Sequence, residues 1–291
     1  MAEVILAKTA GFCFGVKRAV DEVYKEIESG KKIYTYGPII HNDEVVKDLE
    51  AKGVTTIRDD AMLQNLSEED VVIIRSHGIT RETMTTLEAT GATLVDMTCP
   101  FVKRIHNLVS EHRDDYNIVI VGDPVHPEVV AIKSYGDATT KVISDAEAAV
   151  SYVPEKEGGV FIVSQTTFNL NKFREIVEIF EKKGYYSNVV NTICDATRKR
   201  QEEAKAVASG VDVMVVIGDL KSSNSRKLYE ICKEVCAQTY FVQTLEDFER
   251  SGGDLQRTSS CMPSITVGIT AGASTPNNII EEVQKYVRND F

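Results

Sequence analysis

Three of the six cysteines occupy equivalent places in the sequence. Cys13, Cys99 and Cys194 each follow a short apolar segment that predicts a β-strand and precede an amphipathic segment that predicts a helix, at 16–29, 101–114 and 197–209. The helix dipole and the free N–H groups at a helix start favour the thiolate, which is the form that binds metal. Three such thiols at equivalent strand–helix turns predict a three-cysteine metal site. It fits zinc, or an iron–sulfur cluster with one iron that has no cysteine ligand. The alternative is three unrelated buried thiols.

The other three cysteines do not share this placement. Cys232 and Cys236 are four residues apart and lie on the same predicted helical face as Leu228, Ile231 and Val235. We therefore interpret them as small core residues. Cys261 lies beside a serine-rich segment and is interpreted as a thiol without a role in the site.

Polar side chains that suit an anion follow several of the predicted strands. The candidates are three histidines and a group of hydroxyl and amide side chains, namely His41, His77, His126, Ser222, Ser223, Asn224 and Ser274. Donors of these types hold phosphate groups, and the Ser-rich and Gly-rich turns SSNS and AGAST precede predicted helices whose N–H groups can face an anion. No GxxxxGK[ST] or GxGxxG motif is present, so a nucleotide loop is not indicated. His106 and His112 lie within one predicted helix and are interpreted as packing or solvated residues.

Glu128 follows His126-Pro127 and has two interpretations. As a residue in the first turn of the next helix it could cap that helix. As a carboxyl beside the predicted anion site it could deliver a proton to the carbon skeleton of the bound ligand.

Strands and helices alternate along the chain, which predicts an α/β fold with parallel sheets. The pattern repeats three times. The spacing from each of the three cysteines to a glycine turn (Gly37, Gly122 and Gly218) is 24, 23 and 24 residues. The third repeat lacks its last strand, and we expect residues 3–7 to supply it. The predicted units are 13–97, 98–192, and 193–291 together with 1–12. The glycines that we expect just after helices are Gly30, Gly53, Gly91, Gly184 and Gly210.

Composition sets the class of protein. The 291 residues are 43% hydrophobic and carry a net charge of −11, which argues against a nucleic-acid-binding surface. No apolar run approaches the roughly 18 residues of a membrane span, and the N-terminus does not resemble a signal peptide. We therefore expect a cytoplasmic protein without a membrane or nucleic-acid partner.

Nine motifs identify a family. GFCFGVKRAV, IIHN, RSHGIT, DMTCPFV, HPEV, SQTT, DATRKRQ, SSNS and TAGAST occur in this order. The chain closely resembles the 4-hydroxy-3-methylbut-2-enyl diphosphate reductases, the last enzymes of the methylerythritol phosphate route to isoprenoids. The resemblance covers about residues 4–285.

The resemblance implies a fold and an activity. The family fold is three α/β domains in a trefoil around a 4Fe–4S cluster, and the matching ligands are Cys13, Cys99 and Cys194. The unique iron binds the hydroxyl of the allylic diphosphate substrate. Electrons from ferredoxin or flavodoxin, with protons, remove that hydroxyl as water and give isopentenyl and dimethylallyl diphosphate.

The resemblance also assigns side chains. His41, His77, His126, Ser222, Ser223, Asn224 and Ser274 match the diphosphate-binding positions. Thr166 matches the threonine near the substrate hydroxyl, and Glu128 matches the proton donor. Asp123-Pro124 departs from some relatives, and we expect it to alter the loop and not the chemistry.

Two other functions fit part of the pattern. Quinolinate synthase is also built from three repeated α/β units with a three-cysteine cluster, but it should lack the HPEV, SSNS and TAGAST set. A zinc- or cluster-binding sensor without catalysis should carry a basic or partner-binding surface, for which this acidic chain gives no sign.

Overall fold

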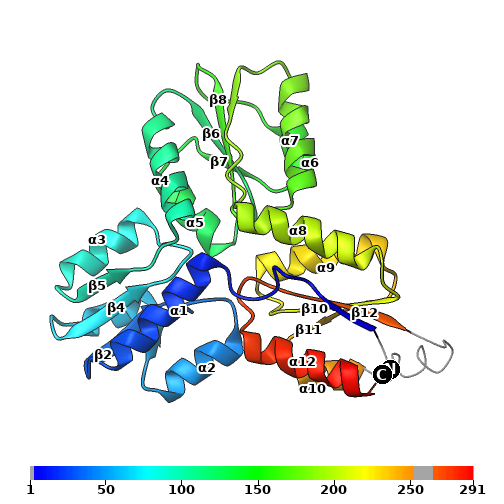
Figure 1. The fold of residues 1–291 in the computed structure, drawn as a ribbon. Coiled ribbons are helices and arrows are strands. Elements are labelled where there is room, and N and C mark those ends of the chain that lie inside the picture. Colours follow the sequence, from blue (N-terminus) through cyan, green and yellow to red (C-terminus); the bar gives the residue numbers. More distant parts are fainter. Residues whose placement is uncertain (1–2, 252–264, 291) are drawn as a thin grey trace. The chain divides into compact units, whose positions relative to one another are not determined.

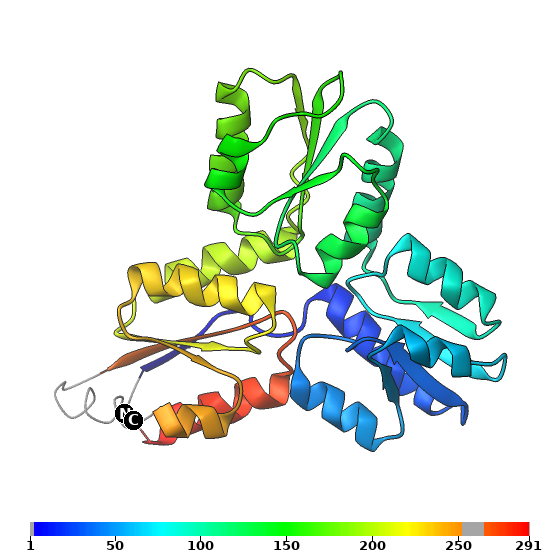
Figure 2. The same ribbon diagram turned by 180° about the vertical axis from the view of Figure 1, so that it is seen from behind.

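A computed structural model describes residues 3–251 and 265–290 of the chain. Strands and helices alternate throughout (Figures 1 and 2). The strands of the described residues form three parallel sheets of four strands each. The predicted α/β class with parallel sheets is confirmed. Cys261 lies outside the described residues.

The chain divides into two compact units. The first contains residues 3–16, 41–45, 195–251 and 265–290, and the second contains 17–40 and 46–194. The predicted three-unit boundaries are not tested by this division and stay a prediction.

One sheet belongs to the first unit. Its order is β1 (Glu3–Leu6), β12 (Thr266–Ala271), β10 (Val213–Ile217), β11 (Thr239–Val242). Glu3 pairs with Thr266, so the N-terminal strand closes this sheet as predicted. Alternate residues of β10 pack against opposite layers, because side chains along a strand alternate between faces. Val215 packs with α10 (Leu245–Ser251) and α12 (Asn277–Asp290), and Val216 packs with α8 (Asp195–Ala208) and α9 (Ser223–Val235). These two pairs of helices cover opposite faces of the sheet (Figure 1).

The second unit contains two sheets. The first has the order β3 (Thr55–Ile57), β2 (Lys32–Tyr36), β4 (Asp70–Ile74), β5 (Thr93–Asp96). The 3₁₀ helix η1 (Asp60–Asn65) and the helix α3 (Arg81–Ala89) contribute Leu63 and Leu87 to the core on one of its faces. The helices α1 (Phe14–Ile27) and α2 (Asp43–Ala51) precede β2 and β3 in the chain.

The other sheet of this unit has the order β7 (Lys141–Ile143), β6 (Asn117–Val121), β8 (Val160–Ser164), β9 (Ser187–Val189). Both faces of β6 and β8 are buried, which explains their continuous apolar runs. The helices α4 (Pro100–His112) and α5 (Pro127–Ser134) pack on one face, and α6 (Ala146–Ser151) and α7 (Leu170–Lys182) pack on the other.

Most of the predicted helix ends are confirmed. Gly30, Gly53, Gly91 and Gly184 have φ between 72° and 93°, the left-handed conformation that ends a helix. Gly210 is the exception, because its φ is not positive. There the chain leaves α8 through a bond from the Gly210 N–H to the Val207 carbonyl.

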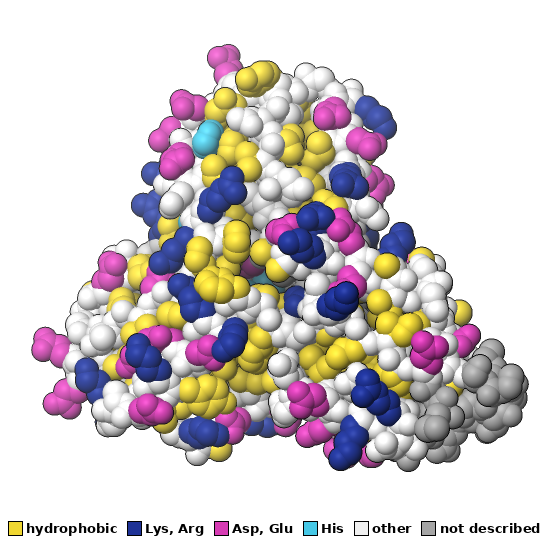
Figure 3. Space-filling view, viewed as in Figure 1, with side chains coloured by type: hydrophobic (Ala, Val, Ile, Leu, Met, Phe, Trp, Pro, Cys, Tyr) yellow, Lys and Arg dark blue, Asp and Glu magenta, His cyan; other side chains and the backbone are white. Residues whose placement is uncertain are grey.

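Within the described part of the chain, no helix combines the length and the apolar composition needed to cross a bilayer. Figure 3 shows basic and acidic side chains interspersed over one face, without a broad area of a single sign.

Candidate active site

The three predicted ligand cysteines lie where the sequence placed them. Cys13 lies between β1 and α1, Cys99 between β5 and α4, and Cys194 between β9 and α8. All three side chains are half-buried. Each thiol therefore lies beside the first turn of a helix, where N–H groups without helical partners favour a negative charge.

Each cysteine is also tied by its backbone to a predicted substrate-binding turn. The Cys13 N–H donates to the Ala273 carbonyl (3.3 Å), the Cys99 N–H to the Ser76 carbonyl (2.9 Å) and the Cys194 N–H to the Thr166 carbonyl (3.0 Å). In each case the acceptor follows the strand that pairs with the cysteine's own strand. The hydrogen bonding between each pair of parallel strands thus continues into the turns that follow them. It fixes each candidate cysteine ligand relative to a turn that is predicted to contact the substrate.

Cys232 and Cys236 are core residues, as predicted. Both are buried and pack with Met214, Val216 and Leu228. Burial raises the pKa of the Cys232 thiol to about 12, so this group stays protonated at neutral pH. A protonated thiol in an apolar layer is a poor metal ligand.

Hydroxyl side chains of the first unit gather at the carboxyl ends of β10 and β12. Ser222 caps α9, and its Oγ accepts the Ser225 N–H at 3.3 Å. The Ser274 hydroxyl donates to the His41 carbonyl at 2.9 Å, which joins two predicted diphosphate-binding residues directly. Ser223 is buried in the first turn of α9. This end of the sheet therefore presents a helix N-terminus together with buried hydroxyl groups.

Asn224 is the residue of this group with the strongest sign of a ligand. Its side chain is 4% exposed, and neither its amide oxygen nor its amide nitrogen has a hydrogen-bond partner among the described residues. The buried Nδ2 of Asn42 and the buried hydroxyl of Thr270, both in the same unit, also lack partners there. Buried polar atoms of this kind cost about 1–3 kcal/mol each unless something satisfies them, so they fit a site that a polar ligand completes.

Asp219 is a feature that sequence reasoning missed. Its buried carboxylate accepts the Lys221 N–H (2.7 Å), the Asp43 N–H (3.2 Å) and the Gln243 Nε2 (3.1 Å). These bonds hold the segment 41–45, which carries His41, against the first unit. The position of Asp219 after the glycine turn was visible in the sequence, but two of its three donors, from Asp43 and Gln243, come from distant segments.

In the second unit, two predicted site histidines lie together. The His77 and His126 rings meet edge to face with centroids 5.4 Å apart. The His126 Nδ1 accepts the Glu128 N–H at 3.1 Å and so caps α5. The neutral His126 ring then carries its proton on Nε2, which makes that atom a hydrogen-bond donor.

Glu128 and Thr166 form a buried two-bond pair. One carboxylate oxygen of Glu128 accepts the Thr166 N–H (2.6 Å), and the other accepts the Thr166 hydroxyl (2.7 Å). Glu128 is 1% exposed. The carbonyl of the same Thr166 accepts the Cys194 N–H, so the candidate proton donor, the Thr166 hydroxyl and the candidate ligand belong to one hydrogen-bonded chain.

Burial raises the pKa of Glu128 from 4.5 to about 7, and the two bonds from Thr166 oppose the rise. A carboxyl with a pKa near neutrality can both hold and release a proton at the pH of the cell. This favours the proton-donor interpretation of Glu128, whose backbone, and not its side chain, takes part in capping α5.

His106 is a packing residue, as predicted. It is buried and stacks on Tyr135 with centroids 4.2 Å apart, and burial lowers its pKa to about 4. His112 stacks on Phe161 at 4.0 Å.

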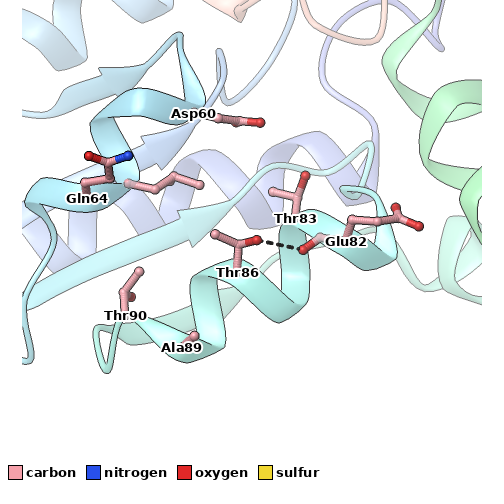
Figure 4. Close-up of a pocket in the computed structure, with 8 residues that line it drawn as sticks. Asp60, Gln64, Glu82, Thr83, Thr86, Ala89 and Thr90 are labelled. Carbon is pink, nitrogen blue, oxygen red and sulfur yellow. Dashed lines mark hydrogen bonds between the residues drawn. The ribbon is translucent and has the colours of Figure 1, made fainter.

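A groove of about 370 Å³ lies away from these residues, between η1 and α3 (Figure 4). Asp60 and Glu82 line it with several threonines. These carboxylates make the groove unfavourable for a diphosphate, and none of the predicted site residues lines it.

Comparisons with known proteins identify the family of the chain. The family model described as LytB protein matches residues 4–288. The chain belongs to the LytB family.

Relatives of this LytB chain carry one name. The chain is 42% identical over 289 residues to a protein of Thermoanaerobacter sp. (strain X514), covering 98% of this chain and 96% of the relative. It is 41% identical over 283 residues to a protein of Geobacter sulfurreducens, covering 97% and 95%. Both relatives are named 4-hydroxy-3-methylbut-2-enyl diphosphate reductase.

Two solved structures match the LytB chain over 99% of its length. The E-1-hydroxy-2-methyl-but-2-enyl-4-diphosphate reductase of Plasmodium falciparum has a TM-score of 0.88 at 26% identity, and 87% of it is covered. A structure of (E)-4-hydroxy-3-methyl-but-2-enyl diphosphate reductase, the terminal enzyme of the non-mevalonate pathway, has a TM-score of 0.69 at 40% identity, and 99% of it is covered. This LytB chain is accordingly an oxidoreductase of isoprenoid biosynthesis.

Proposed function

We propose that this chain reduces 4-hydroxy-3-methylbut-2-enyl diphosphate to isopentenyl and dimethylallyl diphosphate, on a 4Fe–4S cluster held by Cys13, Cys99 and Cys194. The observation that carries the proposal is the buried Glu128–Thr166 pair joined to the Cys194 turn. It unites a proton source, a hydroxyl partner for the substrate and a candidate metal ligand.

The three cysteines fit a cluster of this kind. They are half-buried thiols in matching strand–helix turns, whereas Cys232 and Cys236 are packed in the core. Three thiolates leave one iron of a 4Fe–4S cluster without a protein ligand. When bound, such a cluster supplies electrons and a Lewis-acid site for the substrate hydroxyl.

The first unit supplies diphosphate contacts in this proposal. Ser222, Ser223, Asn224 and Ser274 offer hydroxyl and amide groups beside the start of α9, where backbone N–H groups favour an anion. The orphaned Asn224 amide gains its missing bonds when the diphosphate binds. His41, His77 and His126 add further donors. The His126 Nε2–H can donate because the Nδ1 of the same ring accepts the Glu128 N–H.

Glu128 supplies a proton to the departing hydroxyl. Reduction removes the hydroxyl as water: the C–O bond breaks, two electrons and two protons are consumed, and a C–H bond forms. Hydroxide is a poor leaving group, so a proton must reach it as the bond breaks. The Thr166 hydroxyl, hydrogen-bonded to Glu128, is placed to orient that transfer.

The electron donor in this proposal is ferredoxin or flavodoxin, and the location is the cytoplasm. The family assignment over residues 4–288 disfavours the quinolinate synthase alternative. A sensor without catalysis gives no reason for a buried carboxyl whose pKa lies near 7.

Anaerobic reconstitution with iron and sulfide tests the proposal. We expect about four irons per chain and conversion of the diphosphate substrate with a chemical reductant. Cys99→Ser should lose most of the iron, and the control Cys232→Ser should keep it. Full iron and activity in Cys99→Ser would refute the ligand assignment. Iron without turnover of the substrate would favour the sensor.

A further inference from the structure

Two arginines hold the backbone that leads into cysteine turns. Arg200, on α8, is 4% exposed. Its Nε and Nη2 donate to the Thr9 carbonyl at 2.8 and 2.5 Å, and its Nη2 also donates to the Gly11 carbonyl at 2.6 Å. The guanidinium thus spans two carbonyls just before Cys13, within the first unit.

Arg18, on α1, makes the corresponding contact within the second unit. Its Nη2 donates to the Thr98 carbonyl at 2.8 Å. Its buried Nε has no acceptor among the residues that the structure describes. The Thr98–Cys99 peptide is consequently held at both ends, because its oxygen accepts from Arg18 and its N–H donates to the Ser76 carbonyl.

A guanidinium at this place also has an electrostatic effect. It is always protonated, and it lies one peptide from the Cys99 turn in a half-buried position where charges are weakly screened. A fixed positive charge stabilises the more negative of two redox states. Beside an iron–sulfur cluster, the more negative state is the reduced one.

We propose that Arg18 is a positioning residue that fixes the Cys99 turn and raises the reduction potential of the cluster. This inference rests on the proposed function, in that Cys99 must be a ligand of the cluster for the charge to act on it.

The chain offers a matched control. Arg18 and Arg104 each lie five residues after a candidate ligand, in the similar segments CFGVKR and CPFVKR. Arg104 is exposed, and its guanidinium donates no hydrogen bond to any described residue. Arg104→Gln therefore removes the same charge without touching a cysteine turn.

The experiment compares reconstituted Arg18→Gln, Arg18→Lys and Arg104→Gln by redox titration of the cluster spectrum. At a fixed potential, Arg18→Gln should have a reduced-to-oxidised ratio about tenfold lower than the parent chain, which is 59 mV for a one-electron couple. Arg18→Lys keeps the charge and should recover most of this difference, and Arg104→Gln should match the parent. Equal potentials in Arg18→Gln and Arg104→Gln would overturn the charge effect.

Amide hydrogen exchange gives a readout that does not depend on the cluster's activity. The Cys99 N–H should exchange about tenfold or more faster in Arg18→Gln than in the parent, because one end of its peptide is released. Unchanged exchange would overturn the positioning role. If the parent chain takes up no iron, the proposed function and the charge effect both fail, and exchange at Cys99 still decides whether Arg18 positions this turn.

Discussion

Replacing Glu128 by Gln separates proton delivery from binding. The Gln side chain keeps the shape of Glu, its Oε1 can accept the Thr166 N–H, and the Thr166 hydroxyl can turn to accept from its amide nitrogen. It cannot relay a proton. A general acid contributes about 10²–10⁴-fold to the rate, so kcat should fall by about that factor while iron content and KM change little.

The buried Glu128 carboxyl also makes the free energy of unfolding depend on pH. A rise of the pKa from 4.5 to about 7 corresponds to about 3 kcal/mol, at about 1.4 kcal/mol per pKa unit. Between these two values the folded chain binds more protons than the unfolded chain, so the free energy of unfolding falls as the pH rises through this window. Above about pH 7 the full penalty is present. Glu128→Gln removes it and should be more stable than the parent by up to about 3 kcal/mol at pH 8, with little difference at pH 4.

Two assays check this reasoning. Steady-state kinetics from pH 6 to 8.5 should show the parent kcat falling as the pH rises through about 7, and a low, flat profile in Glu128→Gln. Urea unfolding at pH 5 and pH 8 measures the stability difference. The control is Glu147→Gln, which changes an exposed glutamate in the first turn of α6. Turnover of Glu128→Gln near the parent rate would refute the assignment, and the proton would then come from water or the diphosphate.

Three further changes test neighbouring parts of the site. Asn224→Ala should raise KM about 10-fold to over 100-fold, since a hydrogen bond to a charged group is worth about 1.5–3 kcal/mol. It should not lower the unfolding free energy of the ligand-free chain, because it removes two buried polar atoms that have no partner in the described structure. An unchanged KM would place the diphosphate elsewhere. Thr166→Val removes one bond that lowers the pKa of Glu128, so the fall of kcat with pH should move to a higher pH, and a pH profile that stays in place would contradict the coupling. Asp219→Ala leaves three N–H donors without their acceptor and should lower the unfolding free energy by several kcal/mol. Urea titration measures this loss against the control Asp145→Ala, which removes a helix cap at the surface.

The elements of this fold could be predicted because local patterns and tertiary burial agree. The run 160–164 is apolar at four of its five positions, and it forms β8, which is buried on both faces. The three cysteine turns followed from the same alternation of strand and helix. Gly210 shows the limit of this approach, since a glycine after a helix suggests a left-handed residue but does not require one.

The candidate site was harder to predict where it depends on side chains that meet across the fold. The sequence contained Glu128 and Thr166, but only the structure joins both carboxylate oxygens to Thr166. Asp219 and Arg18 gave no signal, because their partners other than the neighbouring Lys221 lie 24 to 176 residues away. Motif spacing places residues on elements. It does not predict which backbone carbonyl a side chain such as that of Arg18 will contact.

The pairing of β1 with β12 has a consequence for synthesis of the chain. The Cys99 and Cys194 turns depend on partners in residues 76 and 166, both made before them. The Cys13 turn depends on the Ala273 carbonyl and on a strand that ends at residue 271. During translation, which adds about 5–20 residues each second, the first cysteine to leave the ribosome is therefore the last to gain its native anchor. With the proposed ligands, iron loading should thus follow synthesis of β12 and residue 273, and a nascent chain that stops before β12 should carry Cys13 without its β12 partner strand.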